Sequence, residues 1–214
     1  MANIINKGTG AGGIKTNING SAFESKVAIS IIKTLIDDDY VLEEIEKFKT
    51  KTSTIFKVKK NDDLLGLFGS QSSLFKFLNL DEAWEKIAYA KPLKDVRSVW
   101  SKTLIPDIYY FNLKTQKIRL IECKYQDSSG SVDEKLQTSV YKRELWNKLF
   151  KQYGISVTYE YVLGSSNDFW NKIQKSGASK GKKTYQDTFD YLKKNCISYK
   201  IDTGKIEYKI DEII

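Results

Sequence analysis

Two carboxylates and a lysine stand at a spacing that can bring them together in the folded chain. Asp107 is followed, after fourteen residues, by the triplet Glu122-Cys123-Lys124. Because side chains alternate between the faces of a β-strand, Glu122 and Lys124 share one face and Cys123 points to the other. If the two segments pair as a hairpin, Asp107 lies beside the end of the strand that carries Glu122. The three charged groups then converge.

A group of this kind has the chemistry that phosphodiester hydrolysis requires. The carboxylates of Asp107 and Glu122 and the main-chain carbonyl of Cys123 are oxygen ligands suited to Mg²⁺. The metal polarises a phosphoryl oxygen and lowers the pKa of bound water. Lys124 can orient or deprotonate the attacking water, or neutralise charge that develops on the phosphate. By itself a Glu-x-Lys triplet is usually a solvated strand face, so its apolar flank and the upstream Asp107 carry the hypothesis.

Composition narrows the possible chemistry. The 214-residue chain has no histidine, which excludes Ser-His-Asp and Cys-His hydrolases, histidine-dependent nucleases and histidine-ligated zinc enzymes. Its 35 basic residues against 27 acidic ones give a formal charge of +8, which favours a polyanionic partner. Cys123 and Cys196 are too few for a disulfide framework or a structural zinc site. No apolar run resembles a membrane span or a signal peptide, so we expect a cytoplasmic protein.

The elements that would position the three residues follow from turn residues and hydrophobic spacing. Strands at 107–112 and 118–125 form the expected hairpin, with its turn at 114–117. We expect one domain over residues 1–214, since 41% of the residues are hydrophobic and no linker divides the chain. The other predicted elements are a helix at 21–36, strands at 53–59 and 155–163, helices at 131–153 and 184–195, and a closing hairpin at 197–210.

The N-terminal segment has two parts. Residues 1–20 are rich in glycine and predict a flexible arm. In the helix that follows, apolar residues recur every four positions from Phe23 to Leu35, which predicts one buried face. Ser21 and Glu24 have the spacing of a capping box at its start. From this spacing alone, Glu24 is interpreted as a helix-capping residue.

The residues around the charged triplet resemble a known family. Pro106-Asp107 followed by Glu122-Cys123-Lys124 resembles the PD-(D/E)XK nuclease superfamily in its Glu-x-Lys form. The segments Gly8–Gly20 and Gly130–Thr138, together with Phe23-Glu24, resemble small type II restriction endonucleases. The resemblance spans about residues 8–30 and 104–141.

The resemblance implies a fold and a set of roles. The fold is of the α/β class, mixed α+β, with a restriction-endonuclease-like core in which helices flank a central mixed sheet. Asp107 and Glu122 would hold Mg²⁺, with the carbonyl of Cys123, and Lys124 would be the catalytic lysine. Glu24 matches an acid on the first helix that assists the metal site. Gln137, on the helix after the hairpin, matches a residue that some members place beside the active site, and Tyr141 shares its helical face.

The implied substrate is double-stranded DNA, cut at a specific sequence by a homodimer with no cofactor besides the metal. Residues 164–214 would form a C-terminal extension that can read the target. Lysines supply affinity for phosphates, and asparagine and lysine side chains read base edges. Candidate DNA contacts lie in the N-terminal arm, in the segment after the predicted hairpin and in a lysine-rich loop predicted at 176–183. They are Lys15, Thr16, Asn17, Asn19, Ser129, Lys180, Lys182 and Lys183.

Two other functions remain open from the sequence. One alternative is a repair nuclease, recombination nuclease or exonuclease of the same superfamily, which would share the triplet. The spacing of Gln137 and Tyr141 slightly favours this alternative. A DNA-binding module that keeps the fold without catalysis is a third possibility. The complete set of Asp107, Glu122 and Lys124 argues against that last reading.

Overall fold

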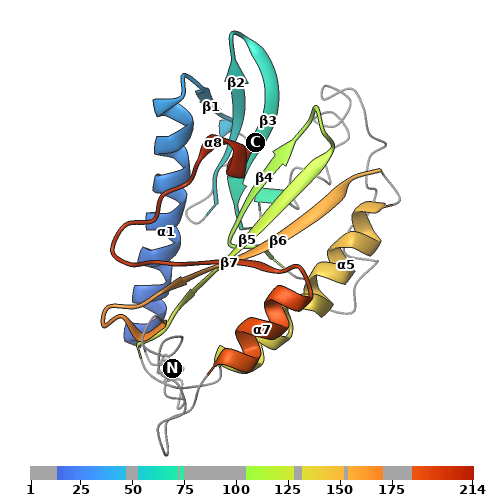
Figure 1. Cartoon of the computed structure of the whole chain (residues 1–214). Helices are drawn as coiled ribbons and strands as arrows, with labels where there is room; N and C mark the ends of the chain where they lie inside the picture. The colour runs from blue at the N-terminus through green and yellow to red at the C-terminus, as the bar shows by residue number, and fades with distance from the viewer. Residues whose placement is uncertain are drawn as a thin grey trace, which may run out of the picture.

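A computed structural model describes residues 14–46, 53–71, 73–74, 105–127, 132–151, 154–170 and 185–214 of the chain. Within these residues a seven-stranded mixed sheet is flanked by helices, so the predicted fold class is confirmed (Figure 1). The strands follow one another across the sheet in sequence order. They are β1 (Val41–Glu44), β2 (Ile55–Lys60), β3 (Asp63–Ser70), β4 (Ile108–Asn112), β5 (Lys117–Tyr125), β6 (Ser156–Gly164) and β7 (Ser198–Ile201).

The sheet has an antiparallel half and a parallel half that meet at β5. Strands β1 to β5 form an antiparallel meander, whereas β5, β6 and β7 run parallel. The predicted hairpin of β4 and β5 and the predicted strands at β2 and β6 are confirmed. Between β2 and β3 the chain turns at Asn61 and Asp62, whose φ angles of 51° and 66° are those of a tight hairpin turn.

Helix α1 (Ile14–Asp37) covers one face of the sheet. Its stripe from Phe23 to Leu35 is buried against the sheet, as predicted. The helix begins seven residues earlier than predicted, so residues 14–20 are helical rather than part of an arm. Gly20 within a helix costs only about 1 kcal/mol relative to alanine, which the packing of the buried stripe offsets. The capping-box interpretation of Ser21 and Glu24 is therefore wrong, because both lie inside the helix.

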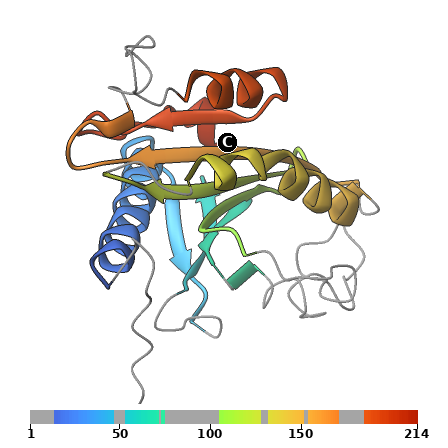
Figure 2. The same ribbon diagram turned by 90° about the horizontal axis from the view of Figure 1, so that it is seen from below.

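The opposite face is covered by α4 (Val132–Gln137), α5 (Ser139–Lys151) and α7 (Gln186–Lys194), and Figures 1 and 2 show α1 and these helices as separate layers. The single helix predicted at 131–153 is broken at Thr138. The hydroxyl of Thr138 donates to the carbonyl of Lys135 at 2.8 Å, a local bond that competes with continued helix. On α5, Trp146, Leu149 and Phe150 are buried and fix the helix on the sheet.

The C-terminal hairpin predicted at 197–210 is wrong. Strand β7 pairs parallel with β6, and after Gly204 (φ 112°) the chain runs beside α1 and ends in α8 (Ile210–Ile213) (Figure 1). Ser30 donates to the carbonyl of Ile206 at 2.5 Å, and Thr34 to that of Tyr208 at 3.2 Å. The segment after Gly204 does not form the second strand of the predicted hairpin. It buries Ile206 and Tyr208 between α1 and the sheet instead. Ile206, Tyr208 and Ile213 thus belong to the core between α1 and the sheet.

Candidate active site

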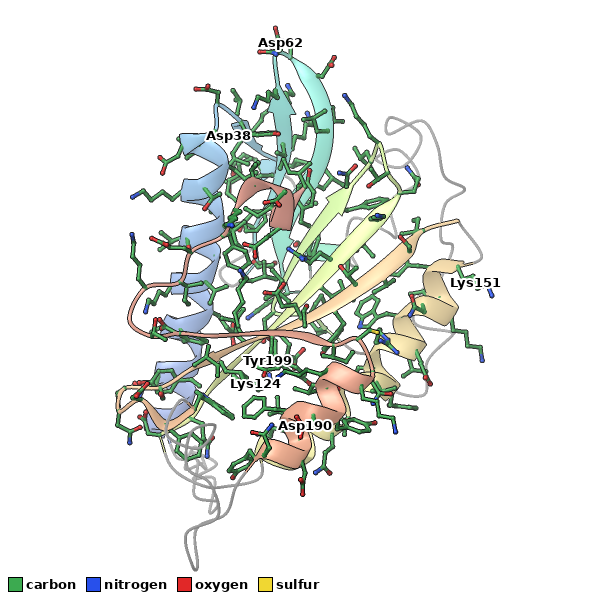
Figure 3. The ribbon with its side chains drawn as sticks, in the orientation of Figure 1. Asp38, Asp62, Lys124, Lys151, Asp190 and Tyr199 are labelled. Carbon is green, nitrogen blue, oxygen red and sulfur yellow. The ribbon has the colours of Figure 1, made fainter. Side chains whose placement is uncertain are left out.

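The structure brings Asp107, Glu122 and Lys124 together at one end of β4 and β5, and Figure 3 labels Lys124 near this end of the sheet. Asp107 immediately precedes β4, opposite the end of β5. Its Oδ2 accepts a hydrogen bond from the main-chain N–H of Cys123 at 2.7 Å. Lys124 Nζ lies 2.8 Å from Oε1 of Glu122 and 3.7 Å from Oδ2 of Asp107. The convergence expected from the hairpin is therefore present.

Strand alternation sets the direction of these side chains. Glu122 and Lys124 lie on the same face of β5 as Ile118 and Leu120, which pack in the core under α4 and α5. Cys123 faces the core under α1. Burial raises the pKa of the Cys123 thiol, with the Asp107 carboxylate acting in the same direction. The thiol therefore stays neutral, and the oxygen donor of this residue is its carbonyl, which accepts from Lys124 Nζ at 3.0 Å.

Two residues that the sequence did not indicate complete the surroundings of Glu122. Lys142, on α5, places its Nζ 3.0 Å from Oε1 of Glu122. Tyr159, on β6, donates its hydroxyl to Oε2 at 3.1 Å. Lys142 is one of many lysines, and no local pattern marks it. Tyr159 is identified only by the register that pairs it with Leu120.

The two carboxylates of the site differ in their charge state. Burial alone would raise the pKa of Glu122, but the ammonium groups of Lys124 and Lys142 outweigh it and lower this pKa. Burial raises the pKa of Asp107 to about 7 against the attraction of Lys124, and the carboxylates of Glu122 and Glu24 repel the ionised form further. For Lys124, burial lowers the pKa, but Glu122 and Asp107 more than reverse the effect. Lys124 is thus a cation between two carboxylates.

Glu24 approaches the site from α1. It lines a cavity of about 430 Å³ together with Asp107 and Gln71. Gln71, which the sequence did not indicate, donates its side-chain amide to Oε2 of Glu24 at 3.1 Å and its main-chain N–H to the carbonyl of Asp107 at 3.1 Å. Gln71 thereby connects the first-helix acid to the chain segment that carries Asp107. Glu24 thus lies inside α1 and beside Asp107, and its role in the site stays a prediction.

The donor set of this site suits a divalent metal ion. In the part of the chain that the structure describes, no three histidine, cysteine, aspartate or glutamate side chains are grouped to hold a metal. The available donors are the carboxylates of Asp107 and Glu122 and the carbonyl of Cys123, all of them hard oxygen ligands. Burial, opposed by Lys124, raises the pKa of Asp107, and a cation bound beside it would favour the ionised carboxylate. The oxygen donors of the site therefore fit an added cation.

The remaining predicted residues lie elsewhere. Gln137 is exposed on α4 and makes no hydrogen bond to Asp107, Glu122 or Lys124, all of which are described, while Tyr141 is 59% exposed. Asn19 is exposed on α1. Lys15, Thr16 and Asn17 belong to the first turns of α1. Ser129, Lys180, Lys182 and Lys183 lie outside the described residues. The roles assigned to all of them stay predictions.

Comparison with known families points to the same segment of the chain. A family model for the PD-(D/E)XK nuclease superfamily domain matches residues 31–141, just over half of the sequence. The match includes Asp107, Glu122 and Lys124, and it leaves out Glu24 and Lys142. Comparisons with curated proteins and with solved structures give no significant match. Among the described helices, none is long and apolar enough to cross a bilayer.

Proposed function

Because this chain belongs to the PD-(D/E)XK nuclease superfamily, we propose that it is a type II restriction endonuclease of a restriction–modification system. It would hydrolyse phosphodiester bonds at a specific sequence in double-stranded DNA, with Mg²⁺ as its cofactor. The observation that carries the proposal is the convergence of Asp107, Glu122 and Lys124 at the end of β4 and β5. The resemblance of Gly8–Gly20 and Gly130–Thr138 to restriction endonucleases supports this class over repair enzymes.

The metal would be held by Asp107, Glu122 and the carbonyl of Cys123. Nucleases of this superfamily generally use divalent metal ions. When bound, the ion supplies a Lewis acid that polarises the phosphoryl group. The chain's own contribution is to keep Glu122 ionised through Lys124 and Lys142, and to fix Asp107 through the N–H of Cys123.

Lys124 is assigned to the stabilisation of negative charge. Its ammonium group lies between two carboxylates, which favour the protonated form. A protonated lysine cannot take a proton from water, so of the three roles open from the sequence the contacts of Lys124 support orientation of the water and charge neutralisation rather than deprotonation. Preorganised cations of this kind act where charge develops in the transition state.

Binding of DNA would depend on the excess of basic residues. The formal charge of +8 suits a phosphate backbone. The predicted contacts in α1 and in the loops, among them Asn19 and Lys180, would position the duplex and read it. We propose a homodimer acting in the cytoplasm on a two-fold symmetric target, with each subunit cutting one strand.

The test is digestion of unmethylated phage DNA with MgCl₂, with EDTA and Lys124→Ala as negative controls. Lys148→Ala, which changes an exposed lysine on α5, is the matched control and should cut as the wild type does. We expect discrete fragments, and a loss of rate of about 10²–10³-fold in Lys124→Ala. Loss from DNA ends or a smear would instead favour the repair or exonuclease alternative. A gel shift without cleavage under any metal would favour the non-catalytic module.

A further inference from the structure

Glu122 accepts more hydrogen bonds than its neutralisation requires. Lys124 and Lys142 both bond to Oε1, at 2.8 and 3.0 Å, and Tyr159 bonds to Oε2. A carboxylate oxygen has two lone pairs, so Oε1 is saturated by the two ammonium groups. The site holds two carboxylates, Asp107 and Glu122, and two lysines, and both lysines contact Glu122. Lys142 is therefore a second cation on a carboxylate that Lys124 already contacts.

The two lysines differ in how firmly they are held. Lys124 contacts the carbonyl of Cys123 and lies 3.7 Å from Asp107 as well as contacting Glu122. Among the described residues, the ammonium group of Lys142 has Glu122 as its one polar partner. The side chain of Lys142 is 22% exposed, so its ammonium group can reach solvent. The buried Trp146, Leu149 and Phe150 hold α5 in place, so Lys142 can leave Glu122 by rotating its side chain alone.

A divalent cation at Glu122 would compete with Lys142 for the same oxygen and repel it. A displaced lysine would then need another anion, and a phosphate group of the bound DNA can supply it. An ammonium group binds phosphate as a point charge. Resting on the proposed function, we propose that Lys142 is a second active-site lysine. It neutralises Glu122 in the metal-free protein and binds a DNA phosphate when Glu122 holds the metal.

The test measures two equilibria rather than cleavage. Lys142→Met removes the charge, and Lys148→Met makes the same change at an exposed position on the same helix. Titration of the DNA-free proteins with Mn²⁺, with free Mn²⁺ followed by electron paramagnetic resonance, should show several-fold tighter binding to Lys142→Met. Binding of a duplex in CaCl₂ at increasing NaCl should show a slope of log K against log salt reduced by about one for Lys142→Met. Lys148→Met should match the wild type in both.

Each departure from this pattern has a defined meaning. Unchanged or weaker Mn²⁺ binding by Lys142→Met would show that Lys142 does not compete with the metal, and an unchanged salt slope would show that it does not bind phosphate. Either result overturns the inference while wild-type cleavage leaves the proposed function standing. A wild type that binds no Mn²⁺ and cuts no DNA overturns both. If thermal unfolding shows that Lys142→Met is not folded, Lys142→Gln, which keeps a hydrogen-bond donor, takes its place.

Discussion

Two glutamates on neighbouring strands, the partly buried Glu122 and the buried Glu160, show how the two faces of this sheet differ. Glu122 on β5 points toward α5, whereas Glu160 on β6 points toward α1 and the C-terminal segment. Glu122 has two ammonium groups within 3.0 Å, and together they lower its pKa despite burial. The nearest cation to Glu160 is the guanidinium of Arg119, with Nε at 3.6 Å. There burial prevails and the pKa of Glu160 is raised.

The difference shows that burial does not decide the charge of a carboxylate by itself. Close ammonium groups can outweigh desolvation, and a longer contact to a single guanidinium does not. On the α5 face the cations lie beside a carboxylate that must remain ionised if it is to bind metal. On the α1 face Glu160 joins Arg119 and Tyr208 beneath the C-terminal segment, where its role is structural. The comparison thus separates the glutamate that we propose as a metal ligand from one that packs beside Arg119 and Tyr208.

The largest expected effect is on activity. Glu122→Gln removes a proposed metal ligand and leaves two lysines facing a neutral amide, so we expect cleavage to fall by about 10³-fold or more. Glu160→Gln, the same substitution on the neighbouring strand, should cut within a few-fold of the wild type. Initial rates on a supercoiled plasmid measure both, with circular dichroism as a check on folding.

Two outcomes of this experiment would contradict the proposed difference between Glu122 and Glu160. A folded Glu122→Gln protein with near wild-type rates would remove Glu122 from the site. A folded Glu160→Gln protein without activity would show that the α1 face takes part in catalysis.

The hydroxyls that bond to the two glutamates give a second, smaller contrast. Tyr159 donates to Glu122 at 3.1 Å, whereas Tyr208 reaches Glu160 only at 3.5 Å. A hydrogen bond to a charged group contributes about 1.5–3 kcal/mol, so Tyr159→Phe should lower Tm by several degrees. Tyr208→Phe should change Tm little, because a contact of this length is weak. Equal decreases in Tm for the two variants in differential scanning calorimetry would show that the two hydroxyls contribute alike to stability.

Much of the framework of the site was predictable because it depends on local sequence. The hairpin of β4 and β5 follows from two runs rich in apolar and aromatic residues on either side of a polar turn, and its register brings Asp107 to Glu122. Strand β3 was not predicted, since Gly66 and Gly69 interrupt its pattern. In the structure an added Cβ at Gly66 would meet the ring of Tyr110, and one at Gly69 the ring of Tyr109. The glycines thus make room for tyrosines that are distant in sequence.

The missed residues share one property: their positions depend on tertiary packing. Lys142 reaches Glu122 because α5 docks on the sheet through Trp146, and its own sequence neighbours give no sign of this. Gln71 reaches Glu24 across 47 positions of the chain. The predicted C-terminal hairpin failed for the same reason, because α1 offers a better partner than an edge strand for the segment after Gly204.

The smallest expected effect concerns the pH dependence of stability. Burial raises the pKa of Glu160 above 4.5, and Glu212 from α8 acts in the same direction. Arg119 from β5, Lys200 from β7 and the hydrogen bond from Tyr208 in the C-terminal segment oppose this increase without reversing it. A raised pKa means that the folded state binds this proton more tightly than the unfolded state does. The resulting stabilisation is complete below pH 4.5 and is lost as the pH rises through the folded-state pKa.

Replacing Glu160 with glutamine removes this titration and leaves the side chain similar in size. Urea unfolding from about pH 4 to about pH 8 should show a shallower fall in the free energy of unfolding for Glu160→Gln than for the wild type. Glu144→Gln, an exposed position on α5, serves as the control and should reproduce the wild-type slope. Parallel curves for all three proteins would mean that Glu160 titrates alike in the folded and unfolded chain. Arg119 and Lys200 would then cancel the effect of burial at Glu160, whereas the two lysines at Glu122 more than cancel it.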